Sequence, residues 1–64
     1  MGDRVYEPAD AVWDAINDLD LTAVDADTIV GSAEVRLGYR IGGHHRIDLL
    51  SLAQGEIDFE RGEE

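Results

Sequence analysis

Two adjacent histidines, His44 and His45, are the residues of this chain whose type and spacing come nearest to a metal site. On a β-strand, neighbouring side chains point to opposite faces, so the two rings could not close on one ion. Only a tight loop could bring them together, with Asp48 as a third ligand. We therefore expect no metal and interpret the pair as loop histidines beside a turn, one of which could make a pH-sensitive contact.

Carboxylates are too common here for their spacing to indicate catalysis. The 64 residues include fifteen Asp and Glu, five Arg and no Lys, for a formal net charge of −10. Pairs such as Asp14 and Asp18 share a helix face, but acid–base chemistry needs burial that shifts a pKa, and these residues lie opposite the apolar face. The segment "GYRIGG" lacks the spacing of a phosphate-binding loop. We expect no catalytic residue, no cofactor and no enzyme activity.

Positive charge gathers in one place. Residues 35–47 hold Arg36, Arg40, Arg46 and both histidines without a single acid, so this stretch carries +3 and the remainder −13. Three interpretations compete: contact with an acidic protein surface, including another copy of this chain; contact with nucleic-acid phosphates by a basic hairpin; or a solvated face that prevents mispairing. We favour the first, because the acidic remainder repels nucleic acid and high salt weakens phosphate contacts.

The elements that must position these residues begin with a helix over about residues 8–19. Pro8 suits the first turn, and residues 1–6 before it form an arm or a short strand. Trp13 is expected in the core, with stacking on a ligand or a partner as the alternative. Apolar residues recur at helical spacing, at Ala9, Val12, Trp13, Ile16 and Leu19.

Residues 27–33 are ambiguous. A helix capped by Asp25 or Asp27 would place Ile29, Val30, Ala33 and Leu37 on one face. Three consecutive β-branched residues, 28–30, and nearby glycines weaken that helix. We favour a strand or an irregular segment over about residues 28–33.

From Val35 the apolar period changes to two, which predicts a strand to Ile41. Gly42 and Gly43 then form a hairpin turn with His44, and a second hairpin turns at Gln54–Gly55. The sequence therefore predicts a single α+β domain over residues 1–64. Its N-terminal amphipathic helix packs on a three- to four-stranded antiparallel β-meander, and residues 60–64 form a frayed acidic tail.

The middle strand, about residues 45–52, has apolar side chains on both faces. The helix can cover one face, so the other requires a partner, unless a curled sheet buries both within one copy. Three arginines and an aromatic ring extend this expected surface. The predicted partner-binding residues are Arg36, Tyr39, Arg40, Arg46, Leu50, Leu52 and Phe59.

Composition indicates the habitat. The absence of Lys, with nine Asp against six Glu, is typical of a halophilic source that keeps molar salt in its cytoplasm, where charge repulsion is screened. No apolar run is long enough to span a membrane, and there is no signal-peptide pattern or cysteine. We expect a cytoplasmic or virion protein.

The function we expect is that of a non-enzymatic structural or protein-interaction subunit, acting as a homo-oligomer or within a larger assembly such as a virion. The alternative is a small nucleic-acid-binding transcriptional regulator that uses the basic hairpin. A third class is a ligand-binding oligomer with Trp13 or Tyr39 as a stacking platform.

Overall fold

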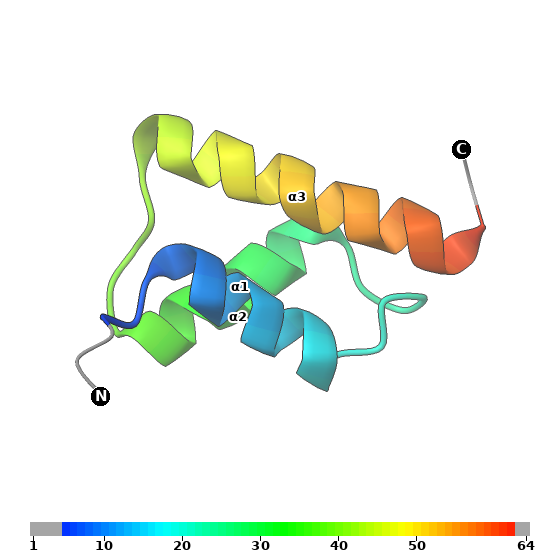
Figure 1. Ribbon diagram of the computed structural model, residues 1–64, viewed down its shortest axis with the longest axis horizontal. Helices are drawn as coiled ribbons and strands as arrows, with labels where there is room; N and C mark the ends of the chain where they lie inside the picture. The colour runs from blue at the N-terminus through cyan, green and yellow to red at the C-terminus, as the bar shows by residue number, and fades with distance from the viewer. Residues whose placement is uncertain (1–4, 63–64) are drawn as a thin grey trace.

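The computed structural model describes residues 5–62 and contains three helices, α1 (Pro8–Asp18), α2 (Ala26–Leu37) and α3 (Gly43–Arg61) (Figure 1). No strand occurs within that range. The predicted α+β class is therefore wrong, and the fold is all-helical. The expected arm and tail lie partly outside the described residues, at 1–4 and 63–64.

The first helix agrees with the sequence. Pro8 occupies the first turn, and the backbone N–H of Glu7 donates to the Asp10 carboxylate at 3.1 Å, which closes the N-terminus. One face is buried and comprises Ala11, Val12, Ala15 and Ile16. The predicted helix over residues 8–19 is confirmed to within one residue.

The strand favoured over residues 28–33 is wrong, and its helical alternative is the structure. Asp25 caps α2, because its carboxylate accepts the backbone N–H of Thr28 at 2.9 Å. Ile29, Val30 and Ala33 are buried on one face, which outweighs the modest helix propensity of the β-branched residues. Gly38 ends the helix at φ 84°, a left-handed conformation that glycine adopts without strain.

The three strands and two hairpins predicted from Val35 onward are also wrong, because residues 35–37 belong to α2 and α3 spans Gly43–Arg61. Leu49, Ala53 and Ile57 are spaced four residues apart and are buried. Helical spacing therefore accounts for the leucine-rich segment that was predicted to be a strand. Gly43 has φ 61°, so the glycine pair serves the entry into a helix and not a hairpin turn. The predicted strand at about residues 45–52, with two apolar faces, was the argument for a partner. Because these residues are helical, that argument no longer holds.

The helices share one core. Helix α2 packs against both α1 and α3, whereas α1 and α3 contact each other least. Figure 1 shows α3 packed on the other two helices, with the C-terminal part of α3 extending beyond the C-terminal end of α1. With 19 residues, α3 is about 28 Å long, against about 16 Å for the 11-residue α1. Near its C-terminal end α3 also contacts the connection between α1 and α2, where the Arg61 guanidinium donates to the Val24 carbonyl at 3.4 Å.

No helix within residues 5–62 has both the length and the apolar character needed to cross a bilayer.

Candidate interaction surface

The arginines of the basic stretch are used to hold the helices together. Arg36, in the last turn of α2, donates to the Asp18 carboxylate at the end of α1, with 2.5 Å between the guanidinium Nη2 and Oδ2. The Arg36 side chain is 30% exposed and that of Asp18 65%, so the pair lies at the surface. It connects the C-terminal ends of α1 and α2.

Arg46 connects α3 to α2. Its guanidinium lies 2.5 Å from Oε2 of Glu34 and 3.4 Å from Oδ1 of Asp27. The same Glu34 oxygen accepts the backbone N–H of Ile41 at 2.9 Å. The Glu34 side chain is only 16% exposed. Glu34 therefore joins three parts of the chain: α2, the connection at residues 38–42, and the first turn of α3.

The three arginines do not form the single basic face that a hairpin would have given. Arg36 faces α1 and Arg46 faces α2, and within residues 5–62 only Arg40 of the three makes no ion pair. Pairing of guanidinium with carboxylate was the reason to expect an acidic partner, and here that pairing forms within one chain. It also removes two cations from any contact with nucleic acid.

His44 and His45 lie in the first turn of α3 and not in a loop, so their predicted loop position is wrong; both are exposed, as is Asp48. Within the described part of the chain, no group of three or more His, Asp or Glu side chains is arranged to hold a metal ion.

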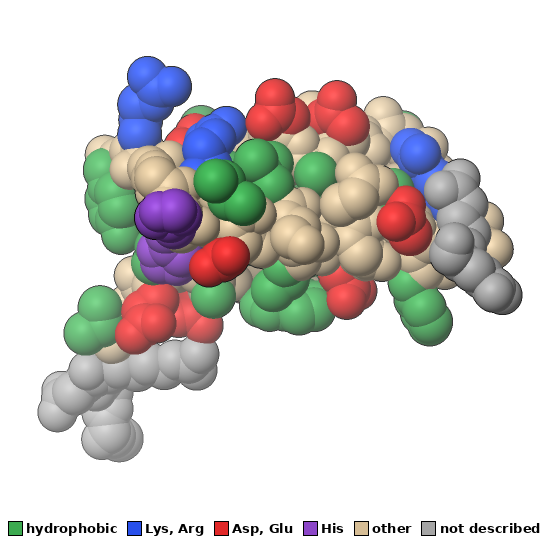
Figure 2. Space-filling model, turned by 90° about the horizontal axis from the view of Figure 1, so that it is seen from above, with side chains coloured by type: hydrophobic (Ala, Val, Ile, Leu, Met, Phe, Trp, Pro, Cys, Tyr) green, Lys and Arg blue, Asp and Glu red, His purple; other side chains and the backbone are tan. Residues whose placement is uncertain are grey.

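The predicted apolar contact residues divide into two kinds. Phe59 and Tyr39 are 78% and 54% exposed, whereas Leu50 and Leu52 are half-buried against the core. Val35 and Ile47 are 82% and 62% exposed, although the strand pattern placed both on an inward face. Helical spacing would have found them. Figure 2 shows hydrophobic side chains standing out in several places among acidic ones.

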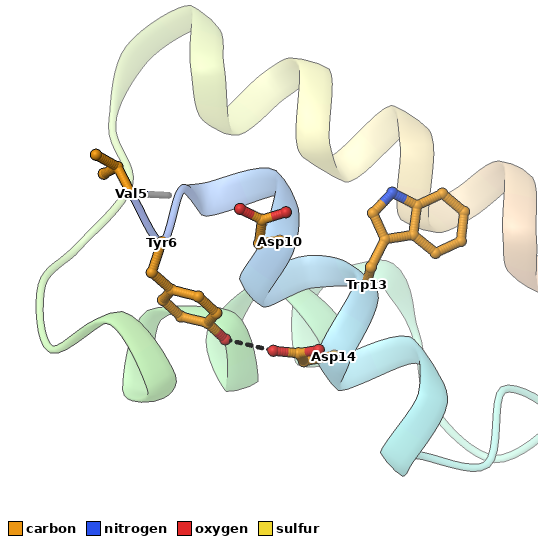
Figure 3. Close-up of a pocket in the computed structure, with 5 residues that line it drawn as sticks. All are labelled: Val5, Tyr6, Asp10, Trp13 and Asp14. Atoms are coloured by element: carbon orange, nitrogen blue, oxygen red, sulfur yellow. Dashed lines mark hydrogen bonds between the residues drawn. The ribbon is translucent and has the colours of Figure 1, made fainter. Parts of the chain in front are cut away.

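A shallow hollow of about 360 Å³ lies between residues 5–6 and α1 (Figure 3). The Tyr6 hydroxyl donates to the Asp14 carboxylate at 2.7 Å, and this hydrogen bond raises the pKa of Tyr6, since losing the proton would remove it. The ring of Trp13 points toward α3 and is 43% exposed, so its predicted core position is wrong. The lining residues are Val5, Tyr6, Asp10, Trp13 and Asp14.

The remaining pKa shifts arise from local hydrogen bonds. Hydrogen bonds from the hydroxyl and backbone N–H of Thr22, at 2.7 and 3.0 Å, lower the pKa of Asp20. Hydrogen bonding to Thr28 lowers that of Asp25. Within the described range no polar or charged residue is buried. These pKa shifts thus arise from a turn at Asp20, the helix cap at Asp25 and the contact between Tyr6 and Asp14.

Comparison of the chain with protein-family models, with curated proteins and with solved structures finds no match.

Proposed function

We propose that this chain is a non-enzymatic interaction subunit that associates with copies of itself, as a homo-oligomer or within a larger assembly. One observation carries the proposal: Val35, Ile47 and Phe59 project into solvent with 82%, 62% and 78% of their surface exposed. Single exposed apolar residues are ordinary, but so many large ones on so small a domain favour contact with another protein.

Charge supports a particular setting. At −10 on 64 residues, copies repel one another in dilute buffer. In molar salt the Debye length falls to about 3 Å, which screens most of that repulsion and leaves apolar contacts to act. We therefore place the protein in the cytoplasm of an organism that accumulates salt, or in a virion produced there.

Binding of nucleic acid receives less support from the geometry. Its strongest argument was a basic surface of three arginines, yet Arg36 and Arg46 contact carboxylates of their own chain. Recruiting them for phosphates would break contacts between helices. Of these three arginines, that leaves Arg40, a single cation on a chain with fifteen Asp and Glu.

Size-exclusion chromatography with light scattering tests the proposal. In about 2 M KCl, where screening is nearly complete, we expect a mass above the 7.0 kDa of one chain and a decrease in mass as salt is removed. A mass of one chain at every protein and salt concentration would refute self-association.

A further inference from the structure

We propose that a hollow between α1 and α3 binds an arginine side chain from a basic segment of a different protein. This hollow, which we call the α1–α3 hollow, has a volume of about 380 Å³. It lies between α1, the connection that follows α1, and the second half of α3. The residues on which the argument depends are Trp13, Ile16, Asp20, Leu21, Glu56 and Glu60. The inference does not rest on self-association, because the partner is not a copy of this chain.

Trp13 gives the α1–α3 hollow an aromatic wall. It belongs to the apolar series of α1, yet it is 43% exposed, whereas Val12 and Ile16 beside it are buried. Its ring points toward α3 (Figure 3), and α1 and α3 are the two helices that contact each other least. The part of the indole left uncovered therefore borders the hollow and offers a surface on which a cation or a flat polar group stacks.

Every charged residue that lines the α1–α3 hollow is acidic. Asp20 comes from the connection after α1, and Glu56 and Glu60 come from α3. The two glutamates form no ion pair within residues 5–62. Arg61 follows them in sequence, but it does not line the hollow and its guanidinium donates to a carbonyl between α1 and α2 at 3.4 Å. The hollow thus gathers negative charge around the indole without a cation of the described chain to neutralise it.

The combination of groups favours a guanidinium. Acids alone would indicate nothing, since fifteen are distributed over the chain. Here they surround an indole and lie beside the buried side chains of Ile16 and Leu21. A guanidinium is flat and weakly hydrated, so it stacks on an aromatic ring while its N–H groups donate to carboxylates. A lysine ammonium is a strongly hydrated point charge, whose attraction to exposed carboxylates is largely screened in molar salt.

The source of that guanidinium follows from charge as well. Free arginine brings a carboxylate of its own, which three acids repel, whereas an arginine inside a polypeptide does not. A second copy of this chain brings a net charge of −10. Its arginines at positions 36 and 46 are already paired with carboxylates, which leaves Arg40 among the three of the basic stretch. A basic segment of another protein is therefore the better complement.

The first test uses the emission of Trp13, the single tryptophan of the chain. Blocked Gly-Arg-Gly and Gly-Lys-Gly peptides carry the same charge and are titrated in about 0.15 M and about 2 M KCl. We expect the arginine peptide to shift the emission at both salt concentrations. The lysine peptide should bind about tenfold more weakly at the higher salt, because it loses the stacking contribution. Equal affinities of the two peptides at both salt concentrations would overturn the assignment to arginine.

The second test locates the contact with variants. Glu56→Gln and Glu60→Gln should each weaken binding of the arginine peptide several-fold. Asp58→Asn is the matched control, since it removes the same charge two residues from each glutamate, on the opposite side of α3 and outside the hollow. It should leave binding unchanged. Equal weakening by all three variants would show attraction to net charge alone and would overturn the α1–α3 hollow.

The aromatic wall is tested with Trp13→Leu, which keeps an apolar side chain but removes the ring. Binding is followed by the anisotropy of a labelled arginine peptide, with circular dichroism to verify that the helices are retained. We expect about tenfold weaker binding, and unchanged binding would contradict stacking on the indole. Wild-type Trp13 emission that shifts with protein concentration alone, and no longer does so in Arg40→Ala, would place a second copy in the hollow and overturn the assignment to a different protein.

Discussion

Replacing Glu34 with Gln is expected to destabilise the fold by about 1–2 kcal/mol. Glu34 is the shared acceptor for the Ile41 backbone N–H, at 2.9 Å, and the Arg46 guanidinium, at 2.5 Å. Hydrogen bonds that involve a charged group contribute about 1.5–3 kcal/mol, against about 0.5–1.5 kcal/mol for neutral ones. The glutamine amide oxygen keeps the acceptor position but loses the charge, so each of the two bonds weakens by roughly 1 kcal/mol at most. Because the Glu34 side chain is only 16% exposed, salt screens this loss incompletely.

Urea unfolding followed by far-UV circular dichroism measures this difference, at fixed salt and in dilute protein. Asp27→Asn is the matched control, since Asp27 contacts the same Arg46 at 3.4 Å but has a side chain 75% exposed. Exposed pairs contribute about 0–1 kcal/mol, so this variant should unfold almost as wild type does. If Glu34→Gln and Asp27→Asn both unfold at the wild-type urea concentration, Glu34 does not hold α2, the connection and α3 together.

Three further outcomes are expected. Ile57→Ala should destabilise the monomer by about 2–5 kcal/mol and Phe59→Ala by less than about 0.5 kcal/mol, because only Ile57 of the two is buried. Equal losses, as expected for two residues on one face of a strand, would contradict the helical structure of residues 57–59. Because the pKa of Asp25 is lowered, its capping contribution is present above the ordinary Asp pKa and is lost as pH falls through the lowered value. Asp25→Asn caps the helix without titrating, so it should lose less α2 helicity on acidification than the wild type does. Coincident circular dichroism curves for the two proteins would exclude this role. Because the pKa of Tyr6 is raised, its contact with Asp14 is present below the ordinary Tyr pKa and is lost as pH rises through the raised value. On a Tyr39→Phe background, Asp14→Asn should return the Tyr6 pKa toward normal in a tyrosinate absorbance titration. An unchanged midpoint would contradict the contact.

The sequence predicted α1 correctly because several local signals agree there. Pro8 marks the start, and apolar residues recur at a single period to Leu19. The later segments fit two periods at once. Val35, Leu37, Tyr39 and Ile41 alternate as in a strand, yet Leu37 also continues the helical series from Ile29. Only the burial of that series against α1 and α3 decides the matter, and burial depends on the whole fold.

The surroundings of the predicted contact residues differ in part from the expectation, for a physical reason. Closeness in sequence predicts that the arginines share a surface, but α2 and α3 turn Arg36 and Arg46 toward different neighbours. With fifteen acids available, no pattern identifies Asp18 or Glu34 as their partners. Phe59 was expected at a contact surface and is exposed, since it lies two residues beyond the buried Ile57 on a helix.

The most direct measurement is sedimentation equilibrium of the wild-type chain over a range of concentrations in about 2 M KCl. Self-association predicts a mass that rises above the 7.0 kDa of one chain as concentration increases and decreases again as salt is removed. A mass of 7.0 kDa at every protein and salt concentration would contradict self-association.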